Sequence, residues 1–460
     1  MSSHRDLFDR QRETFLSDVT KSLDWRLDQL GRLERMLGEN QQAFDEALGT
    51  DFKTAWFERA LEIGSVLGVI ANAKAQVAKW MEPEPAPLSP RLEQHGVRAV
   101  VRREPYGTCL LIAPFNAPIA LTLEPLVAIL SAGNNVIIKP SETTAHLASL
   151  YAEMVGRYFE PEAVAVVNGA REVVEELLSF PFDFIFFTGS TNVGKVVMRA
   201  AAENLTPVLL ELGGMNPVVV DETANLTLAA EEIIWGANTF GGQWCVSPGY
   251  VYVHESVADA FVEACKTAVH KFYGPDPKAS PDFSRIATER DVDRLAGMLK
   301  GATVVHGGAY DRAARYFEPT LVYPATWEQP IMAGEIFGPI LPILPYSDLE
   351  SVINIVKRQP RSLAGYVFSN APVTVNRFVE GLSFGGGCVN QSNLHCVLAE
   401  YLPFGGVGFS GLGRYYGKYG FDSLSYMKPV VISPSDVRID PLLPPYSRED
   451  LAAVNDWLVG

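Results

Sequence analysis

The sequence predicts an α/β protein with two α/β domains, and three observations lead to this fold class. The chain has 460 residues, more than one hydrophobic core usually organises. Hydrophobic residues make up 47% of it and charged residues 20%, a composition typical of folded chains. Short apolar runs of β type alternate with helical runs, which is the pattern of parallel strands covered by helices.

The first segment is predicted to be a long helix over residues 7–37. Apolar residues recur there every three or four positions, and Gly38 follows as a stop signal. The Pro-rich residues 81–90 then indicate an extended connector, and residues 96–104 are β-like. The connector is therefore a candidate domain boundary.

Two series of strands are expected after the connector. The first series begins with the runs Cys109-Leu-Leu-Ile, Asn135-Val-Ile-Ile, Ala163-Val-Ala-Val-Val, Phe184-Ile-Phe-Phe and Val208-Leu-Leu. The second begins near Pro217-Val-Val-Val and continues past Tyr366-Val-Phe. No internal repeat interrupts either series, so two α/β domains are the simplest interpretation.

The charge of the chain indicates a small-molecule ligand. The formal net charge is −16, whereas nucleic acids and anionic membranes attract a surplus of Lys and Arg. The most apolar stretch, residues 108–123, is interrupted by Pro114, Asn116 and Pro118, which disfavours a membrane span. Because the first residues lack the apolar core of a secretory signal, a cytoplasmic protein is expected.

The cysteines favour reduced thiols over a disulfide framework. There are five, an odd number, and no Cys-x-x-Cys pair occurs among them. We therefore expect no metal site. The five are Cys109, Cys245, Cys265, Cys388 and Cys396.

A Gly-rich turn indicates a phosphate-binding helix start. Gly189 and Ser190 follow an apolar strand and precede a helical run, so backbone N–H groups would face a phosphate. The spacing from Gly189 to Lys195 matches a P-loop, but Val196 stands where a P-loop needs Ser or Thr for magnesium. A pyrophosphate cradle without metal fits better, and an ATP-dependent enzyme is the alternative.

A second Gly-rich run, residues 406–411, matches the dinucleotide fingerprint only by letter. It does not follow a strand, and no acidic residue lies about 20 positions on. We interpret it as a structural turn.

Two residues are candidates for acid–base and nucleophilic chemistry. Cys245 follows Gly-Gln-Trp, neighbours that suggest a turn exposing the thiol to backbone N–H groups that favour the thiolate, although free cysteines are often simply buried. Glu211 is a lone carboxylate between leucines at the end of a strand. It could cap a loop, or its apolar surroundings could raise its pKa as a general base requires.

Together, these elements resemble the aldehyde dehydrogenase superfamily along nearly the whole chain, with the class 3 branch as the nearest part. The motifs that carry the resemblance are Ala113-Pro-Phe-Asn116, Lys139-Pro-Ser-Glu142, Phe187-Thr-Gly-Ser190, Leu210-Glu211-Leu-Gly-Gly, Gly242-Gln-Trp-Cys245, Glu335-Ile-Phe337-Gly-Pro and Leu402-Pro-Phe-Gly-Gly-Val-Gly. One such motif would be weak evidence for the resemblance, but seven motifs in one order are specific evidence for it.

The resemblance implies an oxidation of an aldehyde to a carboxylic acid. Cys245 would attack the aldehyde carbon, and the Asn116 amide with the Cys245 N–H would hold the oxyanion. Glu211 would activate the water that hydrolyses the resulting thioester. A CoA-acylating dehydrogenase is the main alternative, a non-catalytic binding relative is another, and Glu211 favours water as the acceptor.

The resemblance also implies NAD as cofactor, with NADP possible. The residues that would bind it are Lys139, Glu142, Gly189, Ser190, Glu335 and Phe337. Lys139 and Glu142 would contact the adenine-side ribose, and Ser190 the pyrophosphate. Glu335 would hold the nicotinamide ribose. In isolation Lys139 would be an ordinary solvated lysine, and Glu142 and Glu335 would be ordinary surface carboxylates.

The fold implied has a Rossmann-like cofactor domain, an α/β catalytic domain and a small oligomerisation arm, and a homodimer is expected. The predicted ranges are 1–84 and 106–210 for the cofactor domain, 211–400 for the catalytic domain, 85–105 and 401–430 for the arm, and 431–460 for a C-terminal tail.

The chain departs from the family pattern at Met215, Trp244, Gly249 and Tyr416, which leaves the substrate pocket open. Trp235, Trp244 and Phe404 could form its wall and favour an aromatic or medium-chain aldehyde. Core packing is the other interpretation of these three rings.

Overall fold

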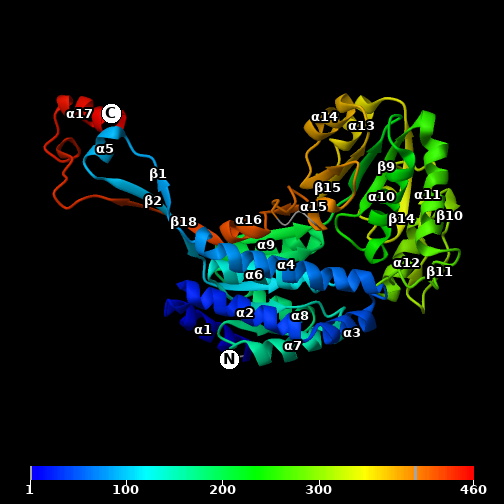
Figure 1. Cartoon of the computed structure of the whole chain (residues 1–460), viewed down its shortest axis with the longest axis horizontal. Helices are drawn as coiled ribbons and strands as arrows, with labels where there is room; N and C mark the ends of the chain where they lie inside the picture. The colour runs from blue at the N-terminus through cyan, green and yellow to red at the C-terminus, as the bar shows by residue number, and fades with distance from the viewer. Residues whose placement is uncertain (1–2, 398–400, 460) are drawn as a thin grey trace.

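The computed structural model describes residues 3–397 and 401–459. These form two α/β units and a narrow arm that extends away from both (Figure 1). The predicted boundary at residue 400 and the outermost ends of the predicted terminal ranges, residues 1 and 460, lie outside the described residues. In the part of the chain that the structure describes, no helix combines the length and the apolar character needed to cross a membrane.

The first unit is built on a six-stranded sheet with the order β17-β7-β6-β3-β4-β5. Its strands are β3 (Thr108–Ile112), β4 (Asn135–Lys139), β5 (Val164–Val166), β6 (Phe184–Gly189), β7 (Val208–Leu212) and β17 (Gly411–Leu412). All are parallel except β17, which is antiparallel to β7. The first predicted series of strands is therefore confirmed. The order of its parallel strands is that of a Rossmann-like sheet.

Helices cover both faces of this sheet (Figure 1). They are α1 (Ser3–Leu16), η1 (Val19–Lys21), α2 (Leu23–Glu39), α3 (Gln41–Asp51), α4 (Trp56–Trp80), α6 (Ala120–Ala132), α7 (Ala145–Tyr158), α8 (Arg171–Leu178), α9 (Thr191–Glu203) and α16 (Gly417–Ser423).

The prediction of one long opening helix was wrong. Asp18 has a left-handed backbone, with a φ of 64°, and ends the first helical segment. The Ser22 hydroxyl then accepts a hydrogen bond from the Trp25 N–H and starts α2 anew, because Ser is a favoured N-cap. Gly38 lies inside α2, which ends one residue later at Glu39.

The second unit holds a seven-stranded sheet with the order β10-β13-β14-β9-β8-β15-β16. Its strands are β8 (Asn216–Val220), β9 (Pro248–His254), β10 (Val304–His306), β13 (Thr320–Val322), β14 (Ile340–Tyr346), β15 (Ala364–Phe368) and β16 (Gly386–Val389). Only the edge strand β10 is antiparallel. The predicted strands at Pro217 and Tyr366 are therefore neighbours in one parallel sheet.

Helices and two short strands complete the second unit. They are α10 (Leu226–Asn238), η2 (Thr239–Gly242), η3 (Glu255–Val257), α11 (Ala258–Tyr273), α12 (Glu289–Met298), β11 (Tyr310–Asp311), β12 (Tyr316–Phe317), η4 (Pro330–Met332), α13 (Leu349–Val356), α14 (Pro372–Gly381) and α15 (Leu394–Val397).

The arm is a three-stranded antiparallel sheet of β1 (Glu84–Ala86), β2 (Arg98–Pro105) and β18 (Ser425–Ile432). The helices α5 (Pro90–Gln94), η5 (Asp440–Leu442) and α17 (Arg448–Val459) lie at its end. The ring centroids of Trp457 and His95 are 4.7 Å apart, and this contact helps to dock the C-terminal helix on α5.

The arm does not include all of the predicted range 401–430. Gly411 and Leu412 pair with β7, and α16 packs against α6, so this part of the chain belongs with the first unit. The pairing of β18 with β2 begins at Ser425. The other domain boundaries stay predictions.

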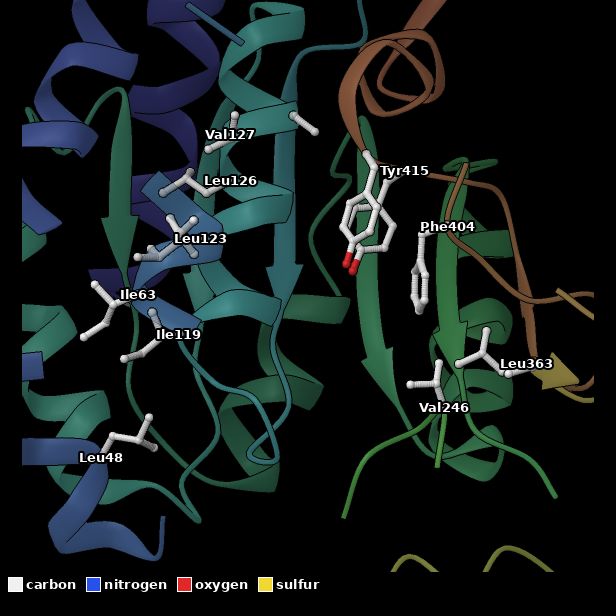
Figure 2. Packing of buried hydrophobic residues seen from close by; sticks show 14 of the residues in the cluster. Leu48, Ile63, Ile119, Leu123, Leu126, Val127, Val246, Leu363, Phe404 and Tyr415 are labelled. Atoms are coloured by element: carbon white, nitrogen blue, oxygen red, sulfur yellow. The ribbon is translucent and has the colours of Figure 1, made fainter. Parts of the chain in front are cut away.

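One large hydrophobic core runs through both units. It includes Ile63 of α4 and Leu123 of α6 on one side, and Val246 and Leu363 of the second unit on the other. Figure 2 shows these side chains, with Phe404 and Tyr415 on the same side as Val246 and Leu363. The two sheets are therefore held against each other by shared apolar burial.

Candidate active site

Several predicted site residues meet at the carboxyl edge of the first sheet. Lys139 ends β4, Gly189 ends β6, and Glu211 lies near the end of β7. Asn116 lies in the loop after β3 and is buried, with 3% of its surface exposed. In open parallel sheets this edge is where ligands bind, so these four strands bring the residues to one place.

Cys245 lies on the turn between η2 and β9, and the backbone of this turn is unusual. Phe240, Gly241 and Gly242 all have left-handed conformations, with φ values of 59°, 64° and 71°. A Cβ at Gly242 would lie 2.3 Å from the carbonyl carbon of Gly338. Glycine is therefore required there by both the conformation and the packing.

Two buried amide side chains hold this turn, and the sequence analysis missed both roles. The Gln243 amide donates to the carbonyls of Phe240 and Arg285 at 2.8 and 3.0 Å, and it accepts from the Ala287 N–H at 2.9 Å. Asn216 donates to the Cys245 carbonyl at 2.9 Å. In the sequence, the role of Asn216 was indicated only by its position as a polar residue at the start of an apolar strand.

The Cys245 thiol is half-buried. Burial and the nearby carboxylates of Glu335 and Glu211 raise its pKa, while the N–H groups of Cys245 and Val246 lower it. The N–H donors expected from the sequence are present, but the net effect is a raised pKa of the Cys245 thiol. The resting turn therefore favours the thiol form, contrary to the expectation of a stabilised thiolate.

Glu211 is 3% exposed, and neither of its carboxylate oxygens has a hydrogen-bond partner among the described residues. Burial raises its pKa well above the ordinary value, against an opposing effect of Arg414. Its apolar neighbours in the sequence indicated this direction. A raised pKa makes this carboxylate a stronger base than an ordinary one, as a general base requires.

Glu335 lies against the glycines that follow Glu211. The Gly214 N–H donates to its carboxylate, and a Cβ at Gly213 would come within 2.1 Å of it. Burial raises the pKa of Glu335 to about 7. Phe337, with a φ of 46°, and Ile336 offer their carbonyls to the Arg294 guanidinium at 3.2 and 2.7 Å, which orients this segment.

The predicted cofactor residues of the first sheet also lie together. The Lys139 ammonium is 2.6 Å from the Glu142 carboxylate. Partial burial acts to raise the pKa of Glu142, but the hydrogen bond from Lys139 leaves it lowered. The Ser190 hydroxyl caps α9 by accepting from the Val193 N–H at 3.4 Å. This helix start can receive a phosphate.

Lys195 of the P-loop-like spacing and the Gly-rich run 406–411 both have structural contacts. The Lys195 ammonium lies 4.9 Å from the centroid of the Phe409 ring. The run 406–411 is a tight turn in which a Cβ at Gly406 would lie 1.9 Å from the Ser410 carbonyl oxygen, so its interpretation as a turn is confirmed.

An apolar cavity reaches the Cys245 thiol. Its lining consists of Leu61, Glu62, Ser65, Ala117, Ala120, Leu121, Glu124, Phe240, Trp244, Cys245, Cys396, Val397, Phe404 and Tyr416. Trp244 and Phe404 thus form part of its wall, as one interpretation of the sequence had it. Trp235 instead packs edge to face on Trp244 at 6.1 Å and lines a separate cavity.

Of the departures from the family pattern, Trp244 and Tyr416 face this cavity. Met215 lines another cavity, and Gly249 is packed so tightly that a Cβ would lie 2.6 Å from the Asn216 N. Among residues 3–397 and 401–459, no three His, Cys, Asp or Glu side chains are grouped so as to hold a metal ion.

Comparison with known proteins agrees with this geometry. The model of the aldehyde dehydrogenase family matches residues 13–430. The chain belongs to the aldehyde dehydrogenase family. It is 39% identical to human aldehyde dehydrogenase family 3 member B1 over 451 residues, 97% of this chain and 95% of that protein. The predicted resemblance, including its class 3 affinity, is therefore confirmed.

Two further relatives cover nearly the whole chain. The rat dimeric, NADP-preferring aldehyde dehydrogenase is 38% identical over 433 residues, 94% of this chain and 95% of that protein. The structure of the substrate-bound state of Staphylococcus aureus AldH superposes with a TM-score of 0.96 at 39% identity and covers 99% of both chains. The predicted aldehyde dehydrogenase fold is confirmed.

One buried carboxylate beside the site was not predicted. Glu58 of α4 accepts hydrogen bonds from the Phe240 N–H at 2.7 Å and from the Ser284 hydroxyl at 2.5 Å. Burial raises its pKa to about 7, although Lys53 acts in the opposite direction.

The raised pKa of Glu58 predicts a pH-dependent stability. Between about pH 4.5 and 7 the unfolded chain releases the proton that the folded protein keeps, so the free energy of unfolding falls as pH rises. Glu58→Gln should lack this effect and gain up to about 3 kcal/mol relative to the wild type between pH 5 and pH 8. Urea unfolding at both pH values measures the difference, with the exposed Glu153→Gln as control. Parallel pH profiles of wild type and Glu58→Gln would contradict the raised pKa.

Proposed function

We propose that this member of the family oxidises an aldehyde to the carboxylic acid, with Cys245 as nucleophile and Glu211 as general base. One observation carries the assignment. The Cys245 thiol ends an apolar cavity, and Glu211 lies near enough to affect the pKa of that thiol. The lack of a hydrogen-bond partner for Glu211 among the described residues leaves its oxygens available to a water molecule.

Each step uses groups at stated positions. The Cys245 sulfur adds to the aldehyde carbon and forms a thiohemiacetal, whose oxygen would be held by the Asn116 amide and the Cys245 N–H. Loss of hydride leaves a thioester on the sulfur. Glu211 then takes a proton from water, which attacks the thioester and releases the acid and the thiol.

The residues on the carboxyl edge fit a nicotinamide dinucleotide, which would supply the hydride acceptor. Lys139 and Glu142 are suited to the hydroxyls of the adenine-side ribose, and the start of α9 at Ser190 to the pyrophosphate. Glu335 and Phe337 lie on the segment that would face the nicotinamide ribose, with Gly213 leaving the space.

The cavity wall supports an apolar substrate. Leu121, Phe240, Trp244 and Phe404 surround the approach to Cys245, which suits an aromatic or medium-chain aldehyde. Since the edge strand β18 of the arm is mostly exposed and the related rat enzyme is described as dimeric, a homodimer is the assembly we propose. Transfer of the acyl group to CoA is the alternative, which Glu211 disfavours.

Cys245→Ala should abolish aldehyde oxidation, because the proposed thioester forms on the Cys245 sulfur. Cofactor binding should remain, since the dinucleotide residues lie on other elements. The turnover is measured by cofactor absorbance and the binding by fluorescence titration, with the buried Cys265→Ala as control. Near-normal oxidation by the Cys245 variant would refute the mechanism.

Glu211→Gln should separate the two halves of the reaction. Gln keeps the shape and removes the base, so the first turnover should still reduce about one cofactor per site while the steady state slows by about 10² to 10⁴. Mass spectrometry of quenched enzyme should find an acyl adduct on the Cys245 peptide. The exposed Glu203→Gln serves as control. A lost burst would place Glu211 before hydride transfer, and unchanged turnover would remove it from the mechanism.

The cofactor preference should favour NAD in kcat/KM, because the Glu142 carboxylate accepts hydrogen bonds from ribose hydroxyls and repels a 2′-phosphate. The ion pair with Lys139 reduces that repulsion, so some use of NADP is expected. Glu142→Ser should raise the NADP/NAD ratio of kcat/KM. A strong NADP preference of the wild type, as the name of the rat relative describes, would overturn the assignment.

A further inference from the structure

A buried ion pair lies at the wall of the cavity, and Glu62 is one of the lining residues. Lys53 has no exposed surface and Glu62 has 2%, and their side chains form a hydrogen-bonded salt bridge. The other Glu62 oxygen accepts from the Ile119 N–H at 2.8 Å and from the Ala120 N–H at 3.1 Å. Helix α6 has no side-chain N-cap of its own, so Glu62 fills that role.

The ion pair of Lys53 and Glu62 therefore fixes the start of α6 at Ala120, shortly after Asn116. The turn from Asn116 to Ile119 has little freedom once two successive N–H groups are bound to a buried carboxylate. The position of the proposed oxyanion donor thus depends on Glu62.

The same lysine contacts the nucleophile turn. The Lys53 ammonium lies 3.3 Å from the centroid of the Phe240 ring, and the Phe240 N–H donates to Glu58 in the first turn of α4, five residues after Lys53. A bulky residue with a φ of 59° is costly and persists only where its surroundings hold it. Lys53 holds the ring and Glu58 holds the backbone.

We propose that Lys53, Glu58 and Glu62 are positioning residues that set the distance between the Asn116 turn and the Cys245 turn. The proposal rests on the proposed function, in which Asn116 and Cys245 act on the same oxygen. A buried ion pair adds little to stability compared with apolar residues of the same size, so its two ties to opposite walls of the site point to positioning.

The test replaces the pair by neutral side chains of similar size, in the double variant Lys53→Met with Glu62→Gln. The matched control is Lys74→Met with Glu34→Gln, which removes a partly exposed ion pair between α4 and α2 whose atoms are 2.5 Å apart. Displacement of a reacting group by about 1 Å costs about 10²-fold, so kcat should fall by about that factor in the test variant only.

Two further readouts exclude a merely structural role. Cofactor affinity should stay within about twofold of the wild type, because Lys139, Ser190 and Glu335 lie on other elements, whereas a general loss of folding would lower it. Alkylation of Cys245 by iodoacetamide should change in rate across its pH profile, because the thiol moves relative to its N–H donors. Unchanged kcat and unchanged alkylation in the test variant would overturn the proposal.

A milder variant covers a failure of the double variant to fold. Ser284→Ala removes the hydroxyl that donates to Glu58 and leaves the ion pair in place. Loss of one such hydrogen bond should lower kcat by about tenfold, and an unchanged kcat would overturn the role of Glu58. Failure of the proposed function is recognised separately, since Cys245→Ala would then retain activity in the otherwise wild-type enzyme.

Discussion

Everything at this site depends on three successive left-handed residues before the nucleophile. Phe240, Gly241 and Gly242 turn the chain sharply enough for Cys245 to end the cavity while Gly242 packs on the backbone of Gly338. Such a conformation is unfavourable by itself, and the surrounding contacts keep it. Glu58, Lys53 and Gln243 all act on this turn, and they come from or bind to both α/β units.

The connection between the two sheets places the other groups. The chain leaves the first sheet after Leu212 and enters the second at Asn216, so Glu211 and Asn216 are five positions apart. Glu211 faces the site, and Asn216 holds the Cys245 carbonyl. The two glycines between them leave space for Glu335. One short segment therefore joins the proposed base, the turn of the proposed nucleophile and the carboxylate proposed to bind the cofactor.

Burial is the common cause of the electrostatics. It raises the pKa of Cys245, Glu211 and Glu335, and all three groups are drawn toward their neutral forms at rest. A neutral thiol and a protonated or easily protonated carboxyl can exist together in an apolar cleft without mutual repulsion.

The sequence by itself determined the parallel strands and the family, because apolar runs and short motifs are local. The same motifs are the source of the proposed catalytic residues. The sequence also indicated the raised pKa of Glu211 from its leucine neighbours. Tertiary structure alone decided the net pKa of Cys245, the break in the opening helix at Asp18 and the place of Gly411 beside β7. It also decided that Lys53, Glu58 and Glu62, which no motif marks, lie behind the site. These depend on contacts between segments far apart in the chain, and such contacts leave no local pattern.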